Sequence, residues 1–164
     1  MPTPTYTPLA NVTLGTTASS VTFSSIPATY RDLILVSSVK FNTGGSNGTL
    51  EFRLNGDSGS NYSYVFMQGT SSGAQSGAGT ITVGVAGQGE NSSGSSFSSS
   101  SAQFMDYSAT DKHKTVLTRG DSPSTATQAW ATRWANTAAI TSILLTNSQG
   151  YAVGSTFNLY GVIA

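Results

Sequence analysis

The 164-residue chain contains no cysteine and a single histidine, His113. Without cysteine there are no disulfides and no thiolate metal sites, so stability must come from packing or from oligomerisation. One histidine also excludes a metal site built on two histidines. We therefore expect neither a structural metal nor a cofactor.

Charge is equally scarce. Charged residues make up 9% of the chain, against roughly 25% in ordinary globular proteins, and seven basic residues balance seven acidic ones. A neutral chain has no field that would attract nucleic acid or an anionic membrane. No apolar run approaches the roughly 20 residues that span a bilayer, and no charged segment followed by an apolar run marks a signal peptide. We expect no nucleic-acid partner and no membrane insertion.

The clearest structural signal lies in residues 50–67. Leu50, Phe52 and Leu54 alternate with polar residues, which is typical of a strand with one buried and one wet face. The turn at Asn55-Gly56-Asp57 tolerates positive φ, and a second alternating run returns through Tyr62, Tyr64 and Phe66. Two such strands cannot bury their apolar face alone, so further strands must cover it.

Similar short runs recur along the chain, separated by Gly- and Ser-rich turns. The most apolar of them, residues 31–41, carries leucines on one face and Ile34 and Val36 on the other, so we expect it to be buried on both sides. The other predicted strands are residues 9–14, 21–23, 81–85, 103–107, 114–118, 128–135, 140–145 and 156–163. About ten short strands and no helical periodicity predict an all-β, antiparallel, jelly-roll-like β-sandwich.

The start of the chain differs from the rest. Residues 1–8 include Pro2, Pro4 and Pro8 together with Tyr6, and so many prolines rule out a helix or a central strand. We expect an extended docking arm at residues 1–8, followed by a single sandwich domain at residues 9–164. Residues 69–80 and 87–101 are so rich in Gly and Ser that we expect two long exposed loops there.

Residues suited to catalysis or to metal binding are few. Asp106, Asp111 and His113 lie close together among many serines, but no serine occupies a GxSxG elbow, so a solvated turn is the simpler interpretation. Hydrolysis of a polysaccharide would need paired carboxylates, such as Asp106 with Asp121 or Glu51 with Glu90. Asn55, Asp57, Ser58 and Asn61 could offer oxygens to Ca²⁺, but a hairpin turn explains the same residues with fewer assumptions. We expect no enzyme and no metal site.

Trp130, Arg133 and Trp134 are the best candidates for contact with a partner or a glycan. The two tryptophans share one face of the predicted strand and could form a platform for a sugar ring or for another protein. The same face carries most of the strand's apolar area, so packing into the core is the alternative for both. The sequence leaves this choice open.

Several phrases resemble a group of tailed-bacteriophage virion proteins that occur as fibre, knob or head-decoration components. The phrases are SVTFSSIPATYRDLIL (20–35), NYSYVFM (61–67), DYSATDKHKT (106–115), RWANTAAITSI (133–143) and GSTFNLYGV (154–162). None of them is a catalytic signature. The resemblance implies a virion-surface β domain, made in the bacterial host cytoplasm, that binds other capsid or tail proteins. By analogy it also implies a homo-oligomer, which we expect to be a trimer. The alternative is a carbohydrate-binding tip that recognises a glycan of the host envelope.

Overall fold

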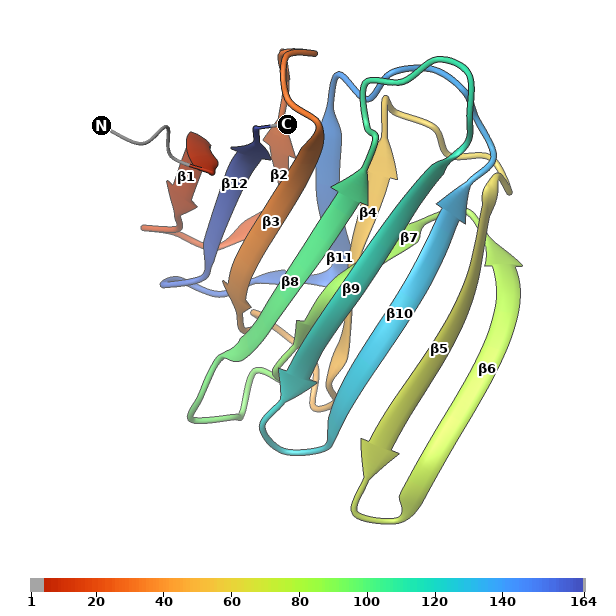
Figure 1. Ribbon diagram of the computed structural model, residues 1–164. Helices are drawn as coiled ribbons and strands as arrows, with labels where there is room; N and C mark the ends of the chain where they lie inside the picture. Colours follow the sequence, from red (N-terminus) through yellow and green to blue (C-terminus); the bar gives the residue numbers. More distant parts are fainter. Residues whose placement is uncertain (1–4, 164) are drawn as a thin grey trace.

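Twelve β-strands and no helix make up residues 5–163, the part of the chain that a computed structural model describes (Figure 1). No helix that could cross a membrane is therefore found in these residues. The strands are β1 (Tyr6–Thr13), β2 (Ala18–Phe23), β3 (Asp32–Val39), β4 (Gly48–Leu54), β5 (Tyr62–Thr70), β6 (Gly73–Ile81), β7 (Gly84–Gly89), β8 (Ser98–Met105), β9 (Lys114–Ser122), β10 (Ala126–Trp134), β11 (Ile143–Tyr151) and β12 (Thr156–Val162).

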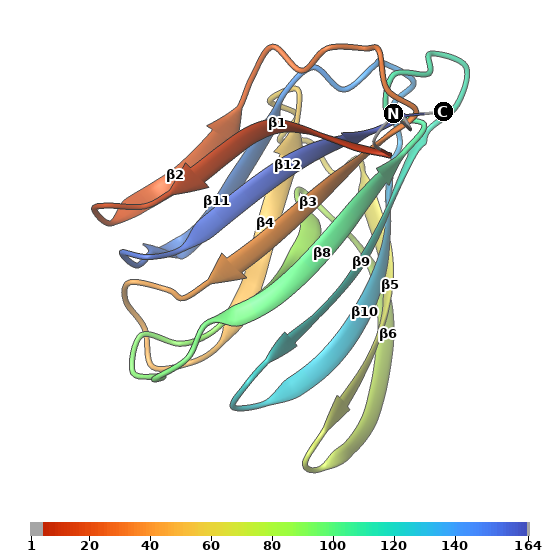
Figure 2. The same cartoon turned by 60° about the vertical axis from the view of Figure 1, so that its left-hand side comes forward.

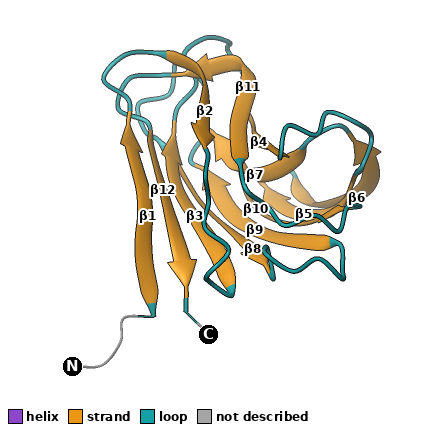
Figure 3. Ribbon diagram, turned by 90° about the horizontal axis from the view of Figure 1, so that it is seen from above, coloured by secondary structure: helices purple, strands orange, loops and turns teal. Residues whose placement is uncertain are grey.

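The strands form two antiparallel sheets of unequal width. The larger sheet has the order β1-β12-β3-β8-β9-β10-β5-β6, and the smaller has the order β2-β11-β4-β7. From β1 to β5 the chain alternates between the two sheets, and Figure 3 shows the smaller sheet lying over one face of the larger. The predicted all-β antiparallel sandwich is confirmed, with twelve strands instead of about ten.

The core lies between the sheets, where the inward-facing residues of alternating strands meet. Leu50, Phe52 and Leu54 of β4 are fully buried, as their spacing predicts. Phe52 joins the two layers, since its ring centroid lies 5.3 Å from that of Phe104 on β8. Gly84 of β7 makes room for the Phe52 ring, because a Cβ at that position would overlap it.

Strand β3 is buried on one face only. Leu33 and Leu35 are fully buried, whereas Val36 is 42% exposed and Ile34 is half-buried. The prediction that this strand is buried on both sides is therefore wrong. The smaller sheet covers only the inner face of the larger one, and within residues 5–163 no element covers the outer face.

The start of the chain also departs from the prediction. Strand β1 begins at Tyr6 and pairs with β12, so Tyr6 and Pro8 belong to an edge strand and not to a separate arm. Proline is tolerated there because an edge strand forms ladder hydrogen bonds on one side only, so the missing N–H of Pro8 costs little. The register with β12 also shifts between Pro8 and Ala10. Pro2 and Pro4 lie outside the described residues.

The two predicted loops are largely strands. Residues 69–80 form the end of β5 and nearly all of β6, and residues 87–101 include the end of β7 and the start of β8. The small residues of β6 have a packing role, because the rings of Phe66 and Tyr64 lie over Gly77 and Gly79. An added Cβ would come within 2.6 Å of the first ring and 3.0 Å of the Tyr64 hydroxyl. Only residues 90–97 remain as a loop in the second segment.

Candidate interaction surface

The outer face of the eight-stranded sheet carries most of the exposed apolar side chains. Of the large apolar residues that are exposed in the described part of the chain, all but Val153 and Ile163 belong to strands of this sheet and point away from the core. They are Tyr6, Val36, Val65, Met67, Met105 and Leu117. Scattered apolar side chains are ordinary on a protein surface, but a contiguous set marks a site of interaction.

This face is hollowed into a groove of about 940 Å³. We call it the outer groove, and its apolar lining includes Ile34, Val36, Val65, Met67, Leu117 and Tyr160. Tyr6, which the sequence assigns to a docking arm, also lines the groove. The residues come from β1, β12, β3, β9 and β5, so the groove runs across most of the sheet, whose strand order can be followed in Figure 1.

The chemistry of the outer groove suits contact rather than reaction. Its lining contains one charged group, the guanidinium of Arg119, whose Nε donates a hydrogen bond to Ser101 Oγ at 3.3 Å. Gln103, Ser76 and Ser101 add polar groups, and among residues 5–163 no carboxylate or imidazole lines the groove. The arrangement can desolvate an apolar partner and orient it through a few hydrogen bonds.

The three residues predicted to contact a partner are not brought together. Trp134 is a core residue, 1% exposed, and its Nε1 donates to Asp57 Oδ2 at 2.7 Å. Trp130 shares the inner face of β10 but is only half-buried, and Arg133 is exposed and points to the opposite, outer face. Core packing therefore applies to Trp134, and only Trp130 leaves indole surface open.

Trp130 lies in a cluster of three aromatic rings that the sequence does not predict. Its ring is stacked on Phe66 at 4.7 Å and lies 5.1 Å from the ring of Tyr64. The indole Nε1 donates to Gln128 Oε1, and Gln128 Nε2, buried, has no partner within residues 5–163. The alternation of Tyr64 and Phe66 predicts that both rings lie on one face of their strand. The sequence does not show that this strand, β5, pairs with β10 and so brings the two rings to Trp130.

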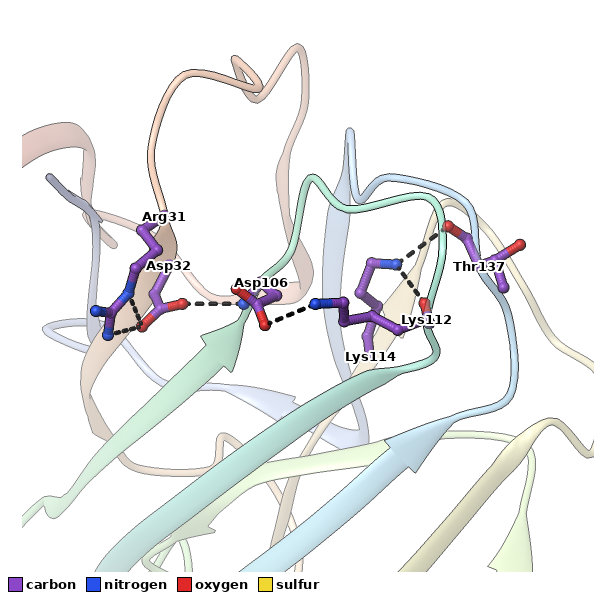
Figure 4. A network of polar contacts seen from close by, with 6 residues as sticks. All are labelled: Arg31, Asp32, Asp106, Lys112, Lys114 and Thr137. Atoms are coloured by element: carbon purple, nitrogen blue, oxygen red, sulfur yellow. Dashed lines mark hydrogen bonds and ion pairs between the residues drawn. The ribbon is translucent and has the colours of Figure 1, made fainter. Parts of the chain in front are cut away.

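The segment around His113 forms a polar network between strands β3, β8 and β9 (Figure 4). Asp32 pairs with Arg31 at 3.0 Å and accepts the backbone N–H of Asp106 at 2.9 Å. Burial alone would raise the pKa of Asp32, but hydrogen bonds from Asp106, Arg31 and Gln103 hold that pKa below its ordinary value. These contacts join the start of β3 to the end of β8.

The other charges of this network are also engaged locally. Asp106 pairs with Lys112 at 3.4 Å, and Lys114 Nζ donates to the carbonyl oxygens of Lys112 and Thr137 (Figure 4). Burial lowers the pKa of Lys114. His113 is exposed, and within the described residues no hydrogen bond joins it to a carboxylate or a hydroxyl.

The carboxylate pairs considered for hydrolysis lie far apart. Asp106 directly follows β8, whereas Asp121 lies near the opposite end of β9, so the two are at opposite ends of the sheet. Glu51 lies opposite Val85, and Glu90 follows five residues later; because one of these residues is taken up by a register shift, Glu90 lies about 13 Å further along at the rise of a strand. Along the strands, the residues of each pair are therefore further apart than the roughly 5–9.5 Å between the two carboxyl groups that glycoside hydrolysis uses.

The oxygens of the candidate calcium turn are occupied by protein donors. Asn55 Oδ1 accepts the backbone N–H groups of Thr141 and Ser142. The Asp57 carboxylate accepts hydrogen bonds from Trp134, Asn61 and the Gly59 N–H, which lower the pKa of Asp57. No group of three acidic, histidine or cysteine side chains suited to a metal occurs in residues 5–163. The residues form the turn that connects β4 of the smaller sheet to β5 of the larger one. The predicted hairpin turn is therefore wrong, because β4 and β5 do not pair with each other.

Comparison with known proteins does not identify a family for this chain. No protein-family model matches the chain, and no curated protein matches it. A solved structure, a mutant alginate lyase in complex with an alginate tetrasaccharide, matches over 94% of this chain and 79% of that chain. Its TM-score is 0.32 and its sequence identity is 9%. A likeness this low carries no conclusion about activity.

Proposed function

We propose that this protein is a structural component of a bacteriophage virion, a decoration or fibre protein on the capsid or tail surface. It acts by binding neighbouring virion proteins through the outer groove. The observation that carries the proposal is the concentration of exposed apolar side chains on one hollowed sheet face. The resemblance of five sequence phrases to virion proteins supports the assignment to a phage.

The exposure of the groove explains why a partner would bind there. Met67 and Val65 are 67% and 55% exposed, and Leu117 is 44% exposed. Covering apolar surface contributes about 25 cal/mol per Å², and the groove is broad enough for several such side chains to be covered at once. Because the face is hollow, it suits a convex apolar ridge on a different protein better than a second copy of the same hollow face.

The composition agrees with a role at the virion surface. A chain without cysteine can be made in a reducing host cytoplasm, and a surface with few charges repels its neighbours weakly in a crowded shell. The groove offers contact groups and no acid–base pair, so the proposed role is adhesion and not catalysis.

Charged substitutions in the groove test the proposal. Leu117→Glu places a carboxylate in the apolar lining, and Val153→Glu is the matched control because Val153 is 53% exposed but lies outside the groove. Each variant is supplied to phage that lack the wild-type protein, and its occupancy is measured on purified particles. We expect occupancy to be lost for L117E and kept for V153E. Normal occupancy of L117E would contradict the proposal.

The N-terminal arm needs a separate test. Deleting residues 1–4 leaves β1 intact, since that strand begins at Tyr6. Circular dichroism checks that the truncated chain is folded. If residues 1–4 help to dock the protein, its occupancy on the particles falls. Unchanged occupancy would mean that residues 1–4 take no part in docking.

A second candidate function is recognition of a host-surface glycan at Trp130. The observation that favours it is the half-buried stack of Trp130 on Phe66, next to Gln128 Nε2, which has no hydrogen-bond partner within residues 5–163. Aromatic faces with nearby amides are the usual groups that hold a sugar ring. Binding on a glycan array that is lost in Trp130→Ala would support this function, and silence of the wild-type protein on the array would remove it.

A further inference from the structure

Strand β6 forms a long open edge of the eight-stranded sheet. It pairs with β5 over nine residues, from Gly73 opposite Thr70 to Ile81 opposite Tyr62, without a register shift. Its other side has no partner strand within residues 5–163, and Figures 1 and 2 show β6 at the outer limit of the sheet. Unpaired N–H and C=O groups along such an edge are a template for another strand.

The opposite edge of the same sheet is protected. Strand β1 carries Pro8, which lacks an N–H, and its register with β12 shifts between Pro8 and Ala10. Proline and bulges are the devices by which natural sheets prevent pairing at their edges. In the smaller sheet, the edge strand β2 has a register shift against β11, and β7 has one against β4. Of the four sheet edges, only β6 is regular along its whole length.

The sequence of β6 contains no proline and no charged residue, and its one long side chain before Ile81 is that of Gln75, which accepts a hydrogen bond from Gln68. Packing under Phe66 and Tyr64 explains Gly77 and Gly79. It does not explain the other face, where the exposed residues are Ala74, Ser76, Ala78 and Thr80. Exposed edge strands commonly use lysine at such positions, and here every one of them is small and neutral.

We propose that β6 pairs antiparallel with β6 of a second copy of this chain, joining two eight-stranded sheets across a twofold axis. An axis at Gly77 brings Ser76 of one copy opposite Ala78 of the other, and Ala74 opposite Thr80. In this register, residues that lie opposite each other point to the same side of the sheet. The outer faces of the two copies therefore form one continuous face, and so do the inner faces. No charge meets its own copy across the axis.

A second copy fits this edge better than an unrelated strand. A twofold interface uses the same surface twice. Strand β6 is neutral along its length and carries only small residues on its outer face, so it is self-complementary in this register. Ser76 of β6 also lines the outer groove, so the pairing takes place at one margin of the groove. Strand pairing extends the sheet in its own plane and does not cover the face that the proposed partner would contact. A threefold axis cannot pair three β6 edges with one another, so the inference selects a dimer over the trimer suggested by analogy.

Paired charge variants of the full-length protein test the register. S76K/A78K places lysine opposite lysine at two points across the axis, whereas S76K/A78E places lysine opposite glutamate at both. Sedimentation velocity over a concentration series measures the oligomeric state of each, with T13K on the protected β1 edge as the control.

We expect wild type, T13K and S76K/A78E to form dimers and S76K/A78K to sediment as a monomer. Circular dichroism checks that all four proteins are folded, and if S76K/A78K fails to fold, the milder S76K takes its place. A wild-type monomer at every concentration, a trimer, or a persistent S76K/A78K dimer would each overturn the proposal. Because no virion protein takes part, these outcomes are independent of the function proposed for the groove.

Discussion

Two parts of the eight-stranded sheet, the centre under the smaller sheet and the far part near β6, have the same alternation of apolar residues but bury their inward side chains to different extents. Where the smaller sheet covers them, the inward residues of β3, β8 and β12 are almost fully buried, Leu35 and Phe104 among them. On β5 and β10, toward the far edge, Tyr64, Phe66 and Trp130 also point inward but remain half-buried. Alternation therefore decides which face a side chain takes, and the width of the second layer decides whether that face becomes core.

Truncating one phenylalanine in each part should give the largest contrast. Phe52→Ala opens a cavity between the sheets next to Phe104 and Tyr62, and we expect a loss of about 3–5 kcal/mol in the free energy of unfolding. Phe66→Ala removes a half-buried ring, and we expect a loss of about 1–2 kcal/mol. Denaturant unfolding of the two variants measures both values. Equal losses would show that the far part of the sheet is as well covered as the centre.

The two tryptophans offer a contrast of intermediate size. Trp134→Phe removes the Nε1–H that the Asp57 carboxylate accepts at 2.7 Å, and a hydrogen bond to a charged group contributes about 1.5–3 kcal/mol. Trp130→Phe removes a bond to the neutral Gln128, for which we expect about 0.5–1 kcal/mol. The same unfolding assay applies. A greater loss in the Trp130 variant would contradict the assignment of Trp134 to the core.

Acid should weaken the protein through Asp32 and Asp57. Hydrogen bonds to each carboxylate hold its pKa below the ordinary value of 3.8, so the unfolded chain binds more protons just below that pH. The stabilising contribution of both groups is present above pH 3.8 and is lost as the pH falls through the lowered pKa values. Unfolding measured as a function of pH should be less acid-sensitive in D57N than in wild type. Identical acid dependence would contradict the role of Asp57.

Substitutions on the outer groove should affect stability least. Val36→Ser and Leu117→Ser change exposed side chains, and we expect the free energy of unfolding to stay within about 0.5 kcal/mol of wild type. Thermal unfolding of each variant checks this expectation. A larger loss would mean that the groove contributes to the folded chain itself and is not reserved for a partner.

Much of the fold could be predicted from local patterns. The alternation at Leu50, Phe52 and Leu54 identified a one-sided strand correctly, and the turn at Asn55 forms with a φ of 52°. Residues 69–80 were missed because small residues resemble a loop, whereas the ring of Phe66 from the neighbouring strand requires Gly77 there. That requirement comes from strand pairing and is not visible within the segment.

The candidate site was harder to predict for the same reason. Trp130 and Trp134 have identical patterns, and only the position of the second layer distinguishes the half-buried ring from the core ring. The outer groove gathers Val36, Leu117 and Met67 from three strands that are distant in sequence. Each looks like an ordinary strand residue by itself, so the surface exists only after the sheet has formed.

Methionine oxidation tests the role of the outer face most directly. Met67 and Met105 are both exposed on that face, and Met67, 67% exposed, lines the groove. Brief peroxide treatment followed by mass spectrometry compares the isolated protein with the protein on intact particles. We expect Met67 to oxidise readily in the isolated protein and to be protected on the particle. Equal oxidation of Met67 in the two states would contradict a docked outer groove.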